Sequence, residues 1–415
     1  MTRRRSLGIF TRPNEQTFRV GFVSDGVYPF NKGGKERRLW EIARRLQAMG
    51  VEVHIYTMRW WEEKRTLDLE GIRFHAICKR RSLYDGERRS IRQALLFGVA
   101  TFKLILARVD VVDVDHIPYF PIFAARIVCM VRRKRMVVTW HEVWGKEYWE
   151  EYLGRLAPLS AATEWLAARM APTIVAVSAQ TSDRLRNVLG VTSPIHAIEL
   201  GVDMTAIRAA PPSVLSSDVL FAGRLLAHKN VDLLLRALAL LTNDRPELRC
   251  AVIGEGPERS RLESLSKELG LAGNVVFHDF LPGSEIYGVM KSGRVFVLPS
   301  VREGFGVVVL EANSCGLPVV TVNHPDNAAR NLIAEGQNGF IAEVSPEGLA
   351  AALKLALGRA ALMDPEAGAQ CSGHLRDWDE VALAVLDVLT SKGPSAARAG
   401  ASRQAGSVGI VKDPK

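Results

Sequence analysis

Two glutamates, Glu303 and Glu311, stand in a stretch that is otherwise apolar or rich in glycine, LPSVREGFGVVVLEANSCGLPVVTV at 298–322. A buried carboxylate is costly unless it is paired or hydrogen-bonded, so a core-like segment that keeps two of them predicts a use for both. Carboxylates are good acceptors for neighbouring hydroxyl groups. We therefore expect a ligand rich in hydroxyls here. The alternative is a helix-end acid and a second glutamate on a solvated helix face.

The elements around the glutamates predict a phosphate site beside them. A strand pattern ends at Ser300, a glycine-rich loop follows, and a helix pattern begins at Val307. The helix then presents free N–H groups and the positive end of its dipole beyond the carboxyl end of a strand, where open α/β sheets bind ligands. Gly304 and Gly306 allow a ligand to approach the backbone closely. A sugar at the first glutamate and a ribose at the second fit this arrangement.

The same alternation of strand and helix patterns runs through most of the chain. Near-continuous Val/Ile runs between amphipathic helices indicate parallel sheets covered on both faces. At 415 residues the chain is too long for one ordinary core. The expected fold class is therefore α/β, with two Rossmann-like doubly wound domains. The expected parts are a basic extension at 1–16, an N-terminal domain at 17–205, a C-terminal domain at 206–375, a C-terminal helix at 376–392 that packs back on the N-terminal domain, and a disordered tail at 393–415.

Charge and cysteine content limit the partners and the compartment. The formal charge of +9 favours an anionic partner, which nucleic acid, nucleotide phosphates and anionic lipid all satisfy. The five cysteines are scattered and form no CxxC pair, which argues against a disulfide framework or a zinc site and favours a reducing cytoplasm. The N-terminus lacks a sustained apolar region, and the longest apolar run, 94–107, is short for a membrane span and contains Lys103. We expect a cytoplasmic protein.

The segment PSVREGFGVVVLEANSCGLPVV resembles the E-x7-E signature of the retaining glycosyltransferases of family 4. The resemblance covers nearly the whole chain up to about residue 391. This family has the GT-B fold, in which two Rossmann-like domains face each other across a cleft. The resemblance implies that Glu303 contacts the sugar of a nucleoside-diphosphate sugar and that Glu311 binds its ribose. It also implies donor contacts at Gly304, Phe305, Gly306 and Val307.

Two further segments match the same family in the same order. FAGRLLAHKNVDLLLRAL resembles its donor-phosphate segment, which implies that Arg224 and Lys229 face the diphosphate. Cations at that place neutralise the charge that develops on the leaving group without a metal. YPFNKGGKERRLWEIARRLQAMGVEVHIYT resembles the family's N-terminal segment, which implies that Gly33 and Gly34 lie opposite the donor phosphates. The alternatives are two exposed cations and an ordinary turn.

Three polar residues end strand patterns of the first domain: Asp115, His116 and His141. In many family members a histidine near the first of these strand ends contacts the sugar, but the register here places Asp115 at that spot and His116 one residue later. Asp115 and His116 are therefore catalytic candidates, and His141 is a candidate substrate contact. A structural role is the alternative for each histidine.

The predicted function is transfer of a sugar from a nucleoside-diphosphate sugar to an acceptor, with no metal and no cofactor. Two departures from the family, Leu200 in place of a frequent Asn and NHPDNAA in place of a Gly-Gly turn, leave the donor undefined. One alternative is a GT-B sugar-nucleotide epimerase, which would consume the donor without an acceptor. Another is a nucleic-acid-binding protein, but the basic residues form no recognised motif, so we expect no nucleic-acid partner.

Basic residues also gather beside aromatic and aliphatic residues at 58–65, 78–98 and 131–135. Cations near an anionic leaflet contribute about 1 kcal/mol each, and adjacent apolar side chains can enter the interface. This pattern predicts peripheral binding at the inner face of the cell membrane and a lipid-linked acceptor or cell-envelope glycan precursor. The alternative is a solvated basic face and a soluble acceptor. The predicted contacts are Trp60, Trp61, Leu95, Leu96 and Phe97, with the cations Arg80, Arg81, Arg88 and Arg89.

Overall fold

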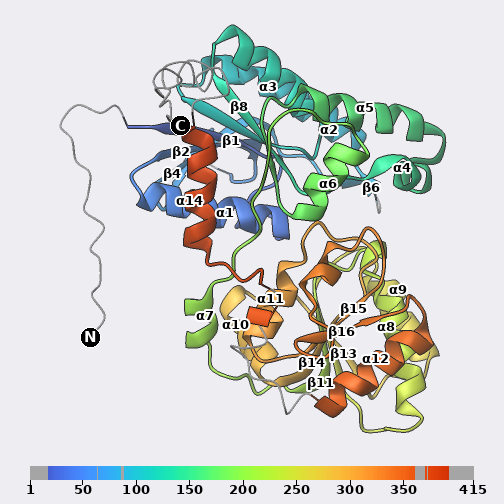
Figure 1. The fold of residues 1–415 in the computed structure, drawn as a ribbon. Helices are drawn as coiled ribbons and strands as arrows, with labels where there is room; N and C mark the ends of the chain where they lie inside the picture. Colours follow the sequence, from blue (N-terminus) through green and yellow to red (C-terminus); the bar gives the residue numbers. More distant parts are fainter. Residues whose placement is uncertain (1–16, 63, 86–87, 360–369, 372, 392–415) are drawn as a thin grey trace, which may run out of the picture.

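A computed structural model describes residues 17–62, 64–85, 88–359, 370–371 and 373–391 (Figure 1). The predicted extension at 1–16 and the predicted tail at 393–415 lie outside the described residues. The described chain forms two α/β domains, one around an eight-stranded sheet and one around a six-stranded sheet.

The N-terminal sheet has the strand order β10-β9-β8-β7-β1-β2-β4-β3, and all its pairs are parallel except that of β3 with β4. Its strands are β1 (Arg19–Val23), β2 (Glu52–Arg59), β3 (Thr66–Leu69), β4 (Ile72–Lys79), β7 (Val111–Asp115), β8 (Arg135–Trp140), β9 (Ile174–Ala176) and β10 (Ile195–Ala197). The helices are α1 (Gly34–Ala48), α2 (Ile91–Thr101), η1 (Phe102–Leu106), α3 (Phe120–Val131), α4 (Gly145–Leu153), η2 (Gly154–Leu156), α5 (Ala157–Met170) and α6 (Ala179–Asn187). A two-stranded ribbon of β5 (Tyr84–Asp85) and β6 (Arg88–Arg89) stands apart from the sheet.

The central strands of this sheet, β2, β1, β7, β8 and β9, are buried on both faces, which explains why they read as nearly continuous apolar runs. Successive strand residues point to opposite faces. Phe22 accordingly belongs to the same core cluster as Ile42 of α1, whereas Val23 belongs to the cluster of Phe97 and Ile122 of α2 and α3.

The C-terminal sheet is wholly parallel, in the order β13-β12-β11-β14-β15-β16. Its strands are β11 (Ser217–Ala222), β12 (Cys250–Ile253), β13 (Val275–His278), β14 (Gly293–Leu298), β15 (Val319–Val322) and β16 (Gly339–Ala342). The helices are α7 (Met204–Ala209), η3 (Ala227–Lys229), α8 (Val231–Thr242), α9 (Arg259–Glu268), α10 (Gly283–Lys291), α11 (Val307–Ser314), η4 (Ala328–Leu332) and α12 (Pro346–Arg359).

Each sheet has one place where the strand order reverses: between β1 and β7 in the first, and between β11 and β14 in the second. The connections before and after such a point diverge to opposite faces of the sheet and leave a crevice at the carboxyl ends of the two strands. The fold therefore provides two ligand sites, one in each domain.

The chain crosses between the domains twice at one place. Val202 on the outward path forms a parallel bridge with Asp377 on the return path. Helix α14 (Trp378–Thr390) then lies against α1 of the first domain (Figure 1). The Arg135 side chain donates to the last carbonyl groups of α14, 2.7 Å to Leu389 O and 3.0 Å to Val388 O. These bonds satisfy carbonyl groups that a helix end leaves without internal partners.

Candidate active site

The polar candidates of the C-terminal domain gather where its strand order reverses. Arg224 and Lys229 follow β11, and Glu303 follows β14, the next strand in the sheet. Lys229 Nζ lies 2.5 Å from Glu303 Oε1, and the two side chains are only 18% and 13% exposed. The Glu303 backbone is fixed by bonds to Asp326 O and from Ala328 N, each 3.0 Å long. The segment that carries Glu303 is thus held from both sides.

Two glycines shape the loop between Glu303 and α11. Gly306 precedes α11 with φ +85°, in the left-handed region that favours glycine. A side chain at Gly304 would collide with the backbone oxygen of His141 in the other domain. Gly304 therefore allows the two domains to touch beside the glutamate. Phe305 between the glycines is buried, and Val307 begins α11.

Glu311 lies in α11 and is 5% exposed. Its Oε1 atom is 2.7 Å from Arg37 Nη1 and accepts a 2.8 Å hydrogen bond from the Tyr287 hydroxyl. Arg37 also donates to that hydroxyl over 2.5 Å. Glu311 raises the pKa of the Arg37 guanidinium. Because Arg37 belongs to α1 of the first domain, this triad joins the domains.

Arg224 also reaches across to the first domain. Its Nη1 atom donates to the Tyr84 hydroxyl over 2.8 Å, and its guanidinium lies 5.7 Å from the centre of the Tyr84 ring. A Cβ at Gly33 would lie 3.9 Å from Arg224 Cζ and would collide with the Glu36 carboxylate, so the space at that position suits glycine. A Cβ added at Gly34 would have no neighbouring atom within 4 Å.

On the N-terminal side, Asp115 ends β7 and His141 follows β8. His141 Nε2 lies 2.9 Å from Asp115 Oδ1. The Lys35 ammonium lies 2.8 Å from Asp25 Oδ1 and 3.7 Å from Asp115 Oδ2. Burial raises the pKa of the Asp115 carboxyl, but Lys35 and the His141 bond outweigh burial, so its pKa lies below the ordinary value. Asp115 is therefore an anion that faces a cation and an imidazole.

His116, the neighbouring candidate, points into the interior. It has no exposed surface, and its ring stacks on Trp140 with 4.7 Å between ring centres. Its Nδ1 atom accepts a 3.2 Å hydrogen bond from the backbone N–H of His141. Burial and the neighbouring His141 keep the pKa of His116 well below its ordinary value. In this structure His116 contacts the site through His141 rather than directly.

A pocket between the domains lies next to Glu303. It is lined by Glu142, Val143, Gln180, Thr181 and Arg184 of the first domain and by Arg302, Glu303, Gly304 and Asp326 of the second. Arg302 enters an aromatic cluster of α4, where its guanidinium lies 3.7 Å from the Tyr148 ring centre and 4.7 Å from that of Trp144. Arg184 pairs with Asp326 over 2.5 Å. These contacts close one side of the cleft.

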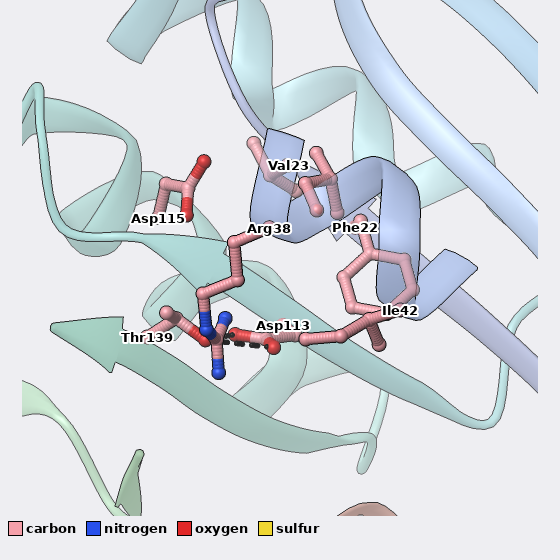
Figure 2. Close-up of a pocket in the computed structure, with 8 residues that line it drawn as sticks. Phe22, Val23, Arg38, Ile42, Asp113, Asp115 and Thr139 are labelled. Carbon is pink, nitrogen blue, oxygen red and sulfur yellow. Dashed lines mark hydrogen bonds between the residues drawn. The ribbon is translucent and has the colours of Figure 1, made fainter. Parts of the chain in front are cut away.

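A second cavity lies inside the first domain, between α1 and the sheet (Figure 2). The Thr139 hydroxyl donates to the Asp113 carboxylate, with oxygen distances of 2.9 and 3.0 Å. Burial raises the pKa of Asp113 to about 7 despite the nearby Arg38. Nε and Nη2 of Arg38 are buried and have no hydrogen-bond partner among the described residues. Asp115 at the edge of the cavity connects this interior cluster to the cleft.

Four contacts of the candidate residues were not predicted from the sequence: Lys35, Arg37, Tyr84 and Tyr287. Lys35 and Arg37 did carry a signal, because both are cations that directly follow the Gly33-Gly34 turn. The two tyrosines carried none, since their roles depend on side chains that reach over from the other domain.

Two family models match adjacent parts of the chain. The model described as Glycosyltransferase Family 4 matches residues 32–206, and the model described as Glycosyl transferases group 1 matches residues 207–364. Together they cover the second sheet and every strand of the first sheet except β1.

The chain is also similar to individual proteins. It is 33% identical over 192 residues to a D-inositol 3-phosphate glycosyltransferase of Streptomyces avermitilis, covering 41% of this chain and 39% of that protein. It is 27% identical over 190 residues to a GDP-mannose-dependent alpha-(1-6)-phosphatidylinositol monomannoside mannosyltransferase of Mycolicibacterium smegmatis, covering 42% of this chain and 49% of that protein. The matches thus span less than half the length of these curated relatives.

Among solved structures, Anabaena HepE in complex with UDP-glucose superposes with a TM-score of 0.69 at 17% identity. The superposition covers 90% of this chain and all of that one. At this identity the likeness concerns the fold alone, and it confirms the predicted arrangement of two facing Rossmann-like domains.

Proposed function

This chain belongs to the family 4 glycosyltransferases, and from that membership we propose that it transfers a hexose from a nucleoside-diphosphate sugar to an acceptor hydroxyl, with retention of configuration at the anomeric carbon. The observation that carries the proposal is the pairing of both glutamates with cations at the edge where the domains meet. Two relatives support the donor class, since one is named for GDP-mannose and one solved structure holds UDP-glucose.

In the proposed complex, Glu303 accepts a hydrogen bond from a hydroxyl of the donor sugar, and Glu311 accepts one from a hydroxyl of the ribose. Arg224 and Lys229 bind the diphosphate, together with backbone N–H groups of residues 304–307 at the start of α11. The bond between the anomeric carbon and the phosphate oxygen breaks, and its electron pair goes to the diphosphate. The cations and the helix end then stabilise the negative charge that develops there.

Asp115 and His141 face this site from the acceptor side. The lowered pKa of Asp115 makes it a poor base. We therefore propose that its carboxylate accepts a hydrogen bond from a substrate hydroxyl and also orients His141. The acceptor hydroxyl forms the new bond to the anomeric carbon. Its proton passes to the departing diphosphate oxygen, which becomes more basic as it gains charge. His116 accepts a hydrogen bond from the backbone N–H of His141 and is a positioning residue in this scheme.

We propose no metal for this reaction, because Arg224 and Lys229 supply the positive charge that a metal would otherwise bring to the diphosphate. The acceptor is a sugar or a lipid-linked glycan precursor. An epimerase remains the alternative activity; it would consume the donor when no acceptor is present.

Two isosteric variants test the assignment. Glu303→Gln is expected to lower turnover while it nearly preserves nucleoside-diphosphate affinity, because the proposed contact is to the sugar. Glu311→Gln is expected to weaken the nucleoside diphosphate itself. Binding is measured by thermal shift with UDP, GDP and ADP, where a ligand at 100 times its Kd stabilises by about 2.7 kcal/mol. Wild-type binding and turnover in both variants would show that the site is elsewhere.

A further inference from the structure

The first domain carries an exposed apolar face on the side of the helices α2, η1, α3 and α5. Helix α3 packs against the other three elements, so the four form one continuous layer. Large apolar side chains of this layer are unusually exposed: Val99 67%, Leu106 81%, Met130 63%, Val131 68%, Leu159 69% and Trp165 45%. Soluble proteins rarely leave apolar residues clustered in this way unless the patch binds something. We call this surface the apolar face.

The charges of the apolar face all have one sign at the surface. Residues 91–109, 116–135 and 153–170 contain ten lysines and arginines and one acidic residue, Glu164. Glu164 is fully buried and accepts hydrogen bonds from Trp144 N, Gly145 N and Trp149 Nε1. Exposed cations such as Arg92, Arg108 and Arg132 therefore have no acidic neighbours within these segments. The basic and apolar side chains of these segments favour an occupant that has both apolar and anionic groups.

The structure corrects the membrane contacts predicted from the sequence. Trp61 and Phe97 are buried in the core, at 9% and 1% exposure. Trp60 donates to Asp25 O over 2.9 Å, and Arg89 pairs with the Asp25 carboxylate at 3.4 Å, so both serve the interior of the domain. Leu95 and Leu96 are 46% and 39% exposed and do belong to the apolar face.

We propose that the apolar face binds the surface of an anionic lipid bilayer, with the apolar side chains in the interface and the arginines and lysines among the headgroups. No helix in the described ranges is long and apolar enough to cross a membrane. A second copy of the chain is a poorer occupant, because it would bring exposed cations such as Arg92, Arg108 and Arg132 against the same cations of the first copy. Figure 1 places α3 and α5 on the side of the first domain away from the second domain, so a bilayer bound there would contact the first domain.

The use of a membrane-borne acceptor would rest on the proposed function, whereas membrane binding itself does not. The test is therefore made without donor or acceptor. Full-length protein is sedimented with vesicles of phosphatidylcholine alone or mixed with phosphatidylglycerol. Binding is expected only to the anionic vesicles, and it should fade at high salt because ions screen the attraction.

Matched variants distinguish binding through the apolar face from non-specific binding to vesicles. Val99→Glu with Leu106→Glu should abolish vesicle binding, whereas Leu355→Glu, a 56% exposed leucine of α12, should leave it unchanged. Arg108→Gln and Arg132→Gln should each weaken binding about fivefold, since a cation near an anionic leaflet contributes roughly that factor. Arg236→Gln on α8 is the matched control for charge, because it is exposed and lies in the second domain.

Melting curves and the thermal shift with nucleoside diphosphate confirm that each variant is folded. Failure of wild type to bind anionic vesicles at low salt would overturn the proposal, and so would full binding by the Val99→Glu, Leu106→Glu variant. Self-association that this variant abolishes, in the absence of vesicle binding, would identify a second copy as the occupant. A wild type that binds vesicles but has no transferase activity would refute the proposed function alone.

Discussion

The triad of Arg37, Tyr287 and Glu311 allows the ribose assignment to be tested on one carboxylate. Both bonds described for Glu311 fall on its Oε1 atom, so we assign the ribose hydroxyl to Oε2. Glu311→Gln keeps the shape of the side chain and removes its charge. A hydrogen bond to a charged group contributes about 1.5–3 kcal/mol, so nucleoside-diphosphate affinity should fall roughly 10- to 150-fold.

Arg37 should act through the same carboxylate. At 2.7 Å and an effective dielectric constant of about 20, the direct attraction of the pair is at most about 6 kcal/mol. Desolvation offsets much of it, and the Arg37 side chain is 30% exposed. We expect Arg37→Met to weaken nucleoside-diphosphate binding about tenfold, because Glu311 loses the bond that orients it. In a Glu311→Gln background the same change should have little effect, since residues that act through one contact are not additive.

The assay is calorimetric titration with a nucleoside diphosphate and with its 2′,3′-dideoxy counterpart. The dideoxy nucleotide lacks the hydroxyls assigned to Glu311, so wild type and Glu311→Gln should bind it about equally. Arg330→Gln serves as the control for the loss of a cation, because Arg330 of η4 donates to Asn323 Oδ1 over 2.9 Å rather than to a candidate residue. An equal loss of affinity for both nucleotides, or additive effects of Arg37→Met and Glu311→Gln, would refute the reasoning.

Three further predictions concern the rest of the site. A chelator should leave most of the turnover intact, whereas Arg224→Ala or Lys229→Ala should lower it by about two to three orders of magnitude; loss with EDTA that Mg²⁺ restores would contradict this. Asp113 has its pKa raised to about 7, so the folded state holds a proton that the unfolded state releases, and the free energy of unfolding should fall by up to about 1.4 kcal/mol per unit as pH rises from 4 to 7. Asp113→Asn should flatten that slope in urea titrations, and an unchanged slope would exclude Asp113 as its source. Gly304→Ala should lower turnover, because its methyl group meets the His141 backbone; wild-type kcat would show that this contact is dispensable.

The sequence was most informative where local pattern alone decides the structure. Continuous apolar runs such as 295–298 form the buried parts of strands, and Gly306 has the left-handed conformation at the start of α11. The alternation of strands and helices predicted two doubly wound sheets, and the reversal of strand order then set Glu303 beside Lys229. Residues at the carboxyl ends of neighbouring strands could be grouped from the sequence because topology brings such ends together.

The sequence was least informative about which way a side chain points and what meets it from the other domain. Asp115 and His116 are adjacent, yet one faces Lys35 in the cleft and the other stacks in the core. Trp61 and Phe97 are of residue types common in membrane contacts, but their positions just after β2 and on α2 bury them. Such outcomes depend on strand register and on long-range packing, which residue type alone does not predict.

The charges of the site explain how two carboxylates can stand in a place where we propose that an anion binds. Glu303 is balanced by Lys229 and Glu311 by Arg37, so neither presents an uncompensated negative charge to a diphosphate. Arg224 has the neutral hydroxyl of Tyr84 as its partner and therefore keeps its positive charge available for an anion, in addition to the positive end of α11. The glutamates can then select hydroxyl groups while the site as a whole remains attractive to phosphate. Removal of Lys229 alone would leave Glu303 as an unpaired charge beside the diphosphate, which is why that cation and that carboxylate have to be considered as one unit.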